Sequence, residues 1–174
     1  GLDIIAAPDF THPEWLEEML PQLAEAGDGV YRLRDSPALG SPPLFLFATE
    51  ISCVWTDAGR GRRVHLLVLA PGIGAVEKLN RALGRITGLA SDGRPTLNLP
   101  VRQFAEIAWQ ADDRFVIVPA HVWTPWYGVY GSKSGFDSLE ECFRDLAPRI
   151  FAIETGLSSD PAMNWRVADV DGRA

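Results

Sequence analysis

The sequence has few cysteines, little positive charge and no long apolar run. Its two cysteines, Cys53 and Cys142, lie far apart and form no Cys-x-x-Cys pair. They are therefore expected to be buried free thiols in a reducing compartment, which fits a cytoplasmic protein. No stretch approaches the ~20 apolar residues that a membrane-spanning helix needs, so no membrane partner is expected. The first residues lack a basic segment, so no signal peptide is predicted.

The net charge of −7 argues mildly against nucleic-acid binding, because phosphate backbones attract basic surfaces. Acidic metal ligands soften this argument, since bound metal cancels their charge. With 174 residues, 47% of them hydrophobic, the sequence predicts one globular domain with a real core. The chain begins without Met and stops without a capped element, and is interpreted as a fragment cut at both ends.

Apolar runs of strand length alternate with segments of helical periodicity. Strands are predicted at residues 3–7, 30–33, 44–51, 64–70, 115–119 and 149–154, helices at 13–26, 74–88, 101–111, 138–146 and 161–167, an arginine-containing turn at 56–63, and a Pro/Gly/Ser loop at 35–43. This alternation predicts βα units around a mainly parallel sheet or barrel, whose site lies at the carboxyl ends of the strands. Glu50, His121 and Glu154 fall at such ends. His65 falls near the start of its run, as expected if that strand is antiparallel to its predecessor, with which it could pair as a local hairpin, or if its register differs.

All three histidines stand in motifs that suit metal binding. His12 belongs to the motif at 9–13, and His65 and His121 lie within or just after apolar runs. The carboxylate of Glu50 has a similar setting. A lone histidine is more often a hydrogen-bonded structural residue, but the coincidence favours a joint site. Imidazole nitrogens and a carboxylate at one edge could hold two or three divalent ions, which indicates a metal-dependent phosphoesterase.

Seven segments of the chain resemble the PHP superfamily, the polymerase and histidinol phosphatase metal-dependent phosphoesterases, and most closely the endonuclease Q family. They are residues 9–13, 48–52, 64–67, 91–95, 119–126, 130–138 and 154–161. The last three are long and unusual, and together the segments run through nearly the whole chain.

The resemblance implies a distorted TIM-like (β/α)7 PHP barrel, here incomplete at both ends, with residues 1–174 as a single partial PHP domain. It also implies two or three divalent metal ions (zinc, manganese or magnesium). The implied activity is a DNA-repair hydrolase, an endonuclease that nicks DNA beside deaminated bases such as uracil and hypoxanthine, or at abasic sites. The isolated fragment is expected to be inactive.

The family's metal ligands carry over unevenly. Glu50 matches the glutamate that bridges two metals and is the predicted catalytic residue. His65 and His121 match the histidines that complete one metal's shell, and Asp9 and His12 are both candidates for a third metal. The family's His-x-His strand and Asp-x-His motif are absent and would lie outside the two ends.

An aromatic loop, rich in glycine and predicted at residues 123–135, follows His121. Its rings may be described in two ways: as a hydrophobic lid on the barrel, or as a platform that stacks on an unpaired or flipped base. Lys133 follows in a Gly-Ser-Lys-Ser-Gly turn that suits a backbone phosphate. The residues predicted to bind DNA are Trp123, Trp126, Tyr127 and Lys133. For the arginines of the turn at 56–63, a solvated turn is favoured over a DNA contact.

Two other functions fit part of the pattern. One is a PHP-type phosphatase of a small phosphate ester, and the broad aromatic loop counts against it. The other is a non-catalytic PHP module attached to a DNA helicase or polymerase, and the presence of Glu50, His65 and His121 counts against that.

Overall fold

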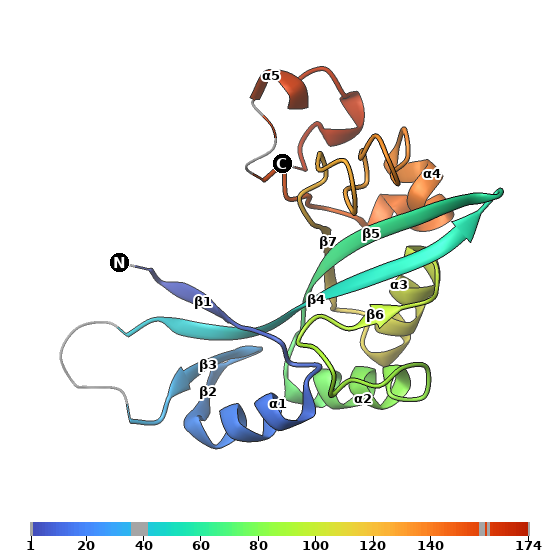
Figure 1. Ribbon diagram of the computed structural model, residues 1–174. Coiled ribbons are helices and arrows are strands. Elements are labelled where there is room, and N and C mark those ends of the chain that lie inside the picture. Colours follow the sequence, from blue (N-terminus) through green and yellow to red (C-terminus); the bar gives the residue numbers. More distant parts are fainter. Residues whose placement is uncertain (1, 36–41, 157–158, 160, 174) are drawn as a thin grey trace. The chain divides into compact units, whose positions relative to one another are not determined.

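The computed structural model describes residues 2–35, 42–156, 159 and 161–173, so most of the predicted loop at 35–43 lies outside the described residues (Figure 1). The strands are β1 (Ile4–Ala7), β2 (Leu23–Gly27), β3 (Val30–Leu33), β4 (Leu44–Asp57), β5 (Arg60–Leu69), β6 (Thr96–Leu97) and β7 (Val116–Pro119). The α-helices are α1 (Pro13–Met19), α2 (Ile73–Leu83), α3 (Val101–Ala111), α4 (Leu139–Phe143) and α5 (Pro161–Asn164), and the 3₁₀ helices are η1 (Leu20–Gln22), η2 (Arg144–Arg149) and η3 (Ala168–Val170).

The chain divides into two compact units. The first contains residues 1–50, 68–95 and 108–115, and the second contains residues 51–67, 96–107 and 116–174. Strands β4 and β5 and helix α3 each run from one unit into the other. The α/β class is confirmed.

The seven described strands belong to one open sheet, in which β2, β3, β4, β5 and β7 follow one another and β1 and β6 also pair with β4. Strand β4 is parallel to β1 and to β6, and antiparallel to β3. It is joined to β5 by Ala58 and Gly59, which both have positive φ, as a two-residue hairpin turn requires. Such a hairpin makes β5 antiparallel to β4, so the sheet is mixed, and the expectation of a mainly parallel sheet was wrong here.

The predicted arginine turn was also wrong, because the hairpin uses only two residues. Arg60, Arg62 and Arg63 lie on β5, and Arg62 is only 9% exposed. The β-branched and aromatic residues of 44–57 extend β4 to 14 residues, well beyond the predicted end at Ile51.

The first unit packs α1 and α2 around an apolar core. Phe10 and Phe47 are fully buried, and the Tyr31 ring meets Phe47 edge-on with centroids 4.7 Å apart. Helix α1 ends at Met19, earlier than predicted. The next residues form η1 and then β2, whose pairing with β3 overrides the helical propensity of residues 24–26.

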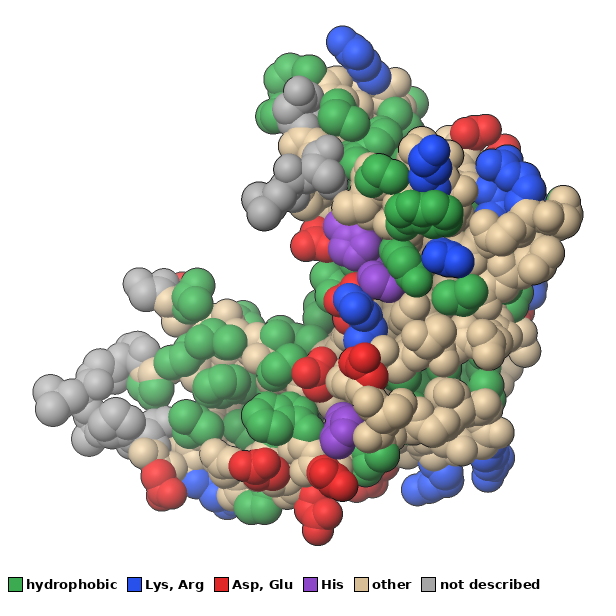
Figure 2. Space-filling model, in the orientation of Figure 1, with side chains coloured by type: hydrophobic (Ala, Val, Ile, Leu, Met, Phe, Trp, Pro, Cys, Tyr) green, Lys and Arg blue, Asp and Glu red, His purple; other side chains and the backbone are tan. Residues whose placement is uncertain are grey.

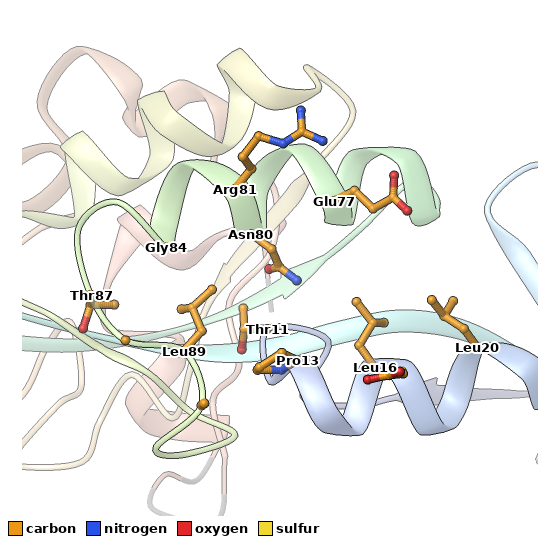
Figure 3. Close-up of a pocket in the computed structure, with 13 residues that line it drawn as sticks. Thr11, Pro13, Leu16, Leu20, Glu77, Asn80, Arg81, Gly84, Thr87 and Leu89 are labelled. Carbon is orange, nitrogen blue, oxygen red and sulfur yellow. The ribbon is translucent and has the colours of Figure 1, made fainter.

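A mainly apolar groove of about 770 Å³ lies between α1 and α2 in this unit (Figure 3). Leu16 of α1 and Leu20 of η1 line the groove, as do Asn80 and Arg81 of α2. It contains neither Glu50 nor any histidine.

Helix α3 has the predicted bounds, and its part in the second unit buries Phe104. Helix α4 is shorter than predicted, since η2 with its internal Pro148 replaces the last turn. The predicted strand at 149–154 was wrong, because its first residue ends η2 and the rest has no regular structure. Glu154 nevertheless bonds through its backbone to Pro119 and Val122.

Cys53 and Cys142 are buried free thiols, as predicted. Burial raises the pKa of both thiols, so each stays protonated near neutral pH. Neither is therefore suited to act as a nucleophile. In the described part of the chain, no helix is long and apolar enough to cross a membrane.

Candidate metal centre

The β4–β5 hairpin places Glu50 and His65 on the same face of the sheet. A two-residue turn opposes Asp57 to Arg60, and the bond from the Ala70 N–H to the Phe47 carbonyl fits the same register. Counting along the strands sets His65 opposite Ser52, two residues from Glu50. Because side chains alternate between faces, Glu50 is the diagonal neighbour of His65.

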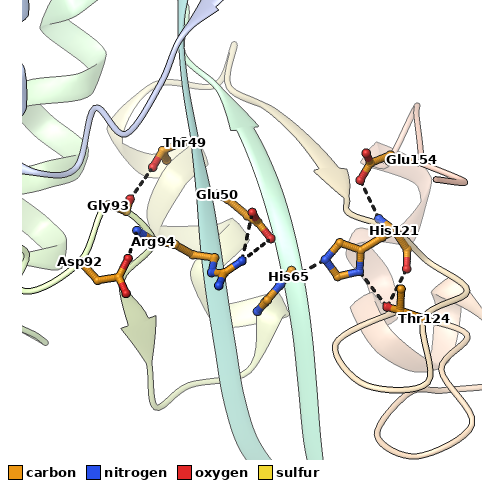
Figure 4. A network of polar contacts seen from close by, with 9 residues as sticks. All are labelled: Thr49, Glu50, His65, Asp92, Gly93, Arg94, His121, Thr124 and Glu154. Atoms are coloured by element: carbon orange, nitrogen blue, oxygen red, sulfur yellow. Dashed lines mark hydrogen bonds and ion pairs between the residues drawn. The ribbon is translucent and has the colours of Figure 1, made fainter. Parts of the chain in front are cut away.

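His121 completes the cluster. Ligand atoms of Glu50, His65 and His121 all lie within 4.8 Å of one another, so these three side chains could hold a metal ion together (Figure 4). His65 Nδ1 and His121 Nε2 are 3.1 Å apart. Histidine side chains reach the surface on the face drawn in Figure 2.

His121, the second residue after β7, is held in an unusual backbone conformation. Its φ is +32°, a region that non-glycine residues rarely adopt and that costs of the order of 1–3 kcal/mol. Glu154 Oε2 accepts a hydrogen bond from the His121 N–H at 2.7 Å, and the Ala120 N–H donates to the His65 carbonyl at 3.0 Å. These two bonds fix the start of the loop beside β5.

Thr124 orients the His121 ring. Its Oγ1 lies 2.8 Å from His121 Nδ1 and 2.8 Å from the Trp126 carbonyl oxygen. The carbonyl can only accept, so the hydroxyl donates to it and accepts from Nδ1–H. That arrangement leaves the lone pair of His121 on Nε2, the atom beside His65, which suits a metal ligand.

Thr124→Val is therefore expected to weaken divalent-metal binding about 10- to 100-fold, the usual cost of removing a partner that orients a ligand. The variant keeps the side-chain shape and removes the hydroxyl. Cobalt titration followed by visible absorption measures the change. Exposed Thr56→Val is the control, and equal affinity of both variants would contradict the orienting role.

Arg94 is a member of the site that the sequence argument did not single out. Its Nη1 lies 3.4 Å from both carboxylate oxygens of Glu50. The turn that carries it is held by Asp92, which accepts the Arg94 N–H, and by Gly93, whose carbonyl faces the hydroxyls of Thr11 and Thr49. The only sequence signal was the Ser-Asp-Gly-Arg-Pro segment within the family resemblance.

Glu154 is the other contributor whose role was not assigned from sequence. The sequence predicts Glu154 at the carboxyl end of a strand. In the structure, its carboxylate accepts a hydrogen bond from the backbone N–H of His121.

Asp9 and His12 are not part of the cluster of Glu50, His65 and His121. His12 caps α1, with Nδ1 accepting the Trp15 N–H, while Nε2 lies 3.2 Å from the Ala90 carbonyl. The Asp9 carboxylate packs against Gly93, where a Cβ would lie 2.7 Å from its carboxyl carbon. Asp9 therefore faces the turn that carries Arg94.

The aromatic loop presents its rings unequally. Trp126 is 49% exposed, and the Arg63 guanidinium lies 5.0 Å from its ring centroid. Trp123 is half-buried, donating its indole N–H to Asn164 and packing on Tyr130. The Tyr127 ring packs on His65 with centroids 4.1 Å apart. Lys133 is exposed.

Two solved structures are similar to this chain over most of its length. One is the lesion-specific endonuclease PfuEndoQ from Pyrococcus furiosus, with 29% identity and a TM-score of 0.73 over 94% of this chain and 36% of that one. The other is endonuclease Q in complex with a 27-mer duplex substrate that has an abasic lesion at the active site, with 28% identity and a TM-score of 0.78.

This chain resembles endonuclease Q. The likeness to the complex covers 99% of this chain and 39% of the endonuclease Q chain, so the sequence spans little more than a third of either matched protein. No protein-family model matches the sequence, and a search of curated proteins gives no significant match. The predicted resemblance to endonuclease Q is thus confirmed by structure, while its PHP assignment is consistent with that fold.

Proposed function

We propose that this chain is the metal-binding part of a DNA endonuclease of the endonuclease Q type. The observation that carries the proposal is the cluster of Glu50, His65 and His121 in a fold that resembles a lesion-specific endonuclease. The proposed substrate is duplex DNA with an abasic site or a deaminated base such as uracil or hypoxanthine. An abasic duplex is the substrate in the similar complex.

The residues present fit a divalent ion. Two imidazoles and one carboxylate form a donor set suited to zinc and also acceptable to manganese, and Thr124 already directs one imidazole. A bound ion would supply an activated water and relieve charge on the phosphate oxygens. We propose Glu50, His65 and His121 as its ligands. Asp9 is favoured over His12 for a further ion, because His12 Nδ1 uses its lone pair to accept the Trp15 N–H and Nε2 faces the Ala90 carbonyl, which can only accept.

Neighbouring residues have separate tasks in this proposal. Arg94 is half-exposed beside Glu50, where its guanidinium can neutralise phosphate charge next to the ligands. Trp126 offers an exposed ring for stacking on an unpaired base, and Lys133 offers a charge for a backbone phosphate. Tyr127 packs on His65 and Trp123 packs on Tyr130, and these contacts support the surface that Trp126 and Lys133 form.

In the whole protein, we propose that residues 1–174 form a single partial PHP domain within a TIM-like (β/α)7 barrel. The likeness to the endonuclease Q chains, of which this chain covers 36% and 39%, supports this proposal. Two or three ions and a cytoplasmic location complete the proposal, the latter suggested by the two free thiols.

The test is cleavage of labelled duplexes by the full-length protein. We expect nicking of a duplex with one abasic site or one deoxyuridine in Mn²⁺ or Mg²⁺, no nicking of the undamaged duplex, and loss of nicking in excess EDTA. Restored nicking after metal is added back separates metal removal from denaturation. Equal cutting of all duplexes, or rapid hydrolysis of a small phosphomonoester without DNA cutting, would favour the phosphatase instead.

A further inference from the structure

The loop after His121 returns to β5 and is bonded along it. The Arg63 N–H donates to the Ser134 carbonyl at 3.4 Å, and the His65 N–H donates to the Tyr127 carbonyl at 2.9 Å. Arg62 Nη1 donates to the Gly135 carbonyl. The segment from Tyr127 to Gly135 is therefore fastened to the strand that carries His65.

Ser134 is the buried link between the two ends of this segment. Its side chain is fully buried, and its Oγ donates to the Arg63 carbonyl at 3.2 Å and accepts the Tyr127 N–H at 3.1 Å. One hydroxyl thus satisfies a carbonyl of β5 and an amide of the loop. A buried hydroxyl with both partners fixes position, because losing it leaves two polar groups unpaired.

Tyr127 transmits this restraint to His65. Tyr127 has a φ of +66°, so its backbone needs external support to persist. Its ring covers the His65 ring with centroids 4.1 Å apart and planes 33° apart, and its carbonyl accepts the His65 N–H. The ring and the backbone of one residue therefore both restrain the same imidazole.

The far end of the segment is anchored independently. The Arg62 guanidinium lies 3.9 Å from the Phe136 ring centroid, and Phe136 stacks on Trp55 of β4 with centroids 5.8 Å apart. In the chain, Ser134 therefore lies between Tyr127 and the anchored residue Phe136.

We propose that Ser134 is a positioning residue for the metal centre, acting on His65 through Tyr127. The proposal rests on the proposed function, because it takes His65 to be a ligand. The hydroxyl of Ser134 holds the Tyr127 amide, the Tyr127 ring then limits rotation of the His65 imidazole, and the ligand nitrogen is presented beside His121. These contacts together determine the affinity of the site for a metal ion.

The experiment compares Co²⁺ affinity in full-length protein carrying Ser134→Ala or Ser132→Ala. Ser132 is exposed in the same loop and is the matched control. Ser134→Ala is expected to bind Co²⁺ about 10- to 100-fold more weakly, as for other residues that support a ligand, whereas Ser132→Ala stays within about twofold of the wild type. The visible absorption of bound Co²⁺ should also change only in Ser134→Ala.

Tyr127→Leu and Tyr127→Phe test the route of the effect. Tyr127→Phe keeps the ring and should retain the wild-type affinity, whereas Tyr127→Leu should lose affinity as Ser134→Ala does. The double variant Ser134→Ala/Tyr127→Leu should be no weaker than the single variants, because both act on the same contact.

The possible outcomes distinguish the positioning role of Ser134, the route through Tyr127 and the metal centre itself. Folded Ser134→Ala with wild-type Co²⁺ affinity overturns the proposal, and additive losses in the double variant overturn the route through Tyr127. If Ser134→Ala fails to fold, wild-type affinity in Tyr127→Leu overturns the proposal and a loss there, with rescue by phenylalanine, supports it. Failure of the wild-type protein to bind Co²⁺ would instead refute the metal centre itself.

Discussion

Glu50→Gln is expected to lower the rate of DNA cleavage at least about 100-fold, more than the loss of a residue that merely supports a ligand. Glutamine keeps the shape of the side chain and removes its negative charge. The donor set then loses its carboxylate, and Arg94, 3.4 Å away, loses its anionic partner. Single-turnover cleavage of a labelled abasic duplex measures the effect.

DNA binding should be retained in Glu50→Gln, because Glu50 lies outside the aromatic loop that is proposed to contact DNA. The dissociation constant for the abasic duplex is expected to stay within about threefold, measured by fluorescence anisotropy in EDTA. Glu77→Gln, an exposed carboxylate of α2, is the control and should cleave normally. Undiminished cleavage by Glu50→Gln would remove this residue from the catalytic role.

Trp126→Ala is expected to reduce the preference for damaged over undamaged DNA by roughly 5- to 150-fold, because each base–aromatic stacking contact is worth ~1–3 kcal/mol. Trp126 is the most exposed of the three predicted aromatic contacts, and Arg63 lies over its ring. A damaged base is easier to unstack, so an exposed ring that can stack on it favours damaged DNA. The measurement is kcat/KM on matched duplexes with and without an abasic site.

Trp165→Ala provides the comparison for this result. Trp165 is 79% exposed in the segment after α5, so its removal tests whether any exposed indole matters. We expect it to leave the preference unchanged. If Trp126→Ala keeps the full preference, or Trp165→Ala loses as much, the stacking assignment is incorrect.

The sequence was sufficient to bring Glu50, His65 and His121 together, because two of them stand at ends of clear apolar runs and the family pattern includes all three. The antiparallel direction expected for the strand that carries His65 is confirmed, but the length of the turn before it was wrong. A hairpin of two residues was hidden in the stretch 56–63, whose glycines and arginines resemble a long turn. Only tertiary pairing shows that the arginines are strand residues.

Other contributors could not be predicted because their role depends on contacts distant in sequence. Glu154 acts on the backbone of His121, 33 residues away, and Arg94 reaches Glu50 across 44 residues. Helix α1 illustrates the same limit, since residues 24–26 favour a helix locally and become a strand through β3. The motif around His12 predicts a candidate metal ligand, but a histidine before Pro13 can also cap the helix, and this is its role in the structure.

The closely packed glycines of the aromatic loop limit where its side chains can be changed. At Gly128, Gly131 and Gly135, an added Cβ would lie 2.4–2.6 Å from backbone atoms of the same loop, so these positions resist any side chain. Trp126 and Lys133 face solvent within that fixed backbone. New specificities can therefore be sought in a small library that randomises these two exposed positions and preserves the glycines as an inherited scaffold.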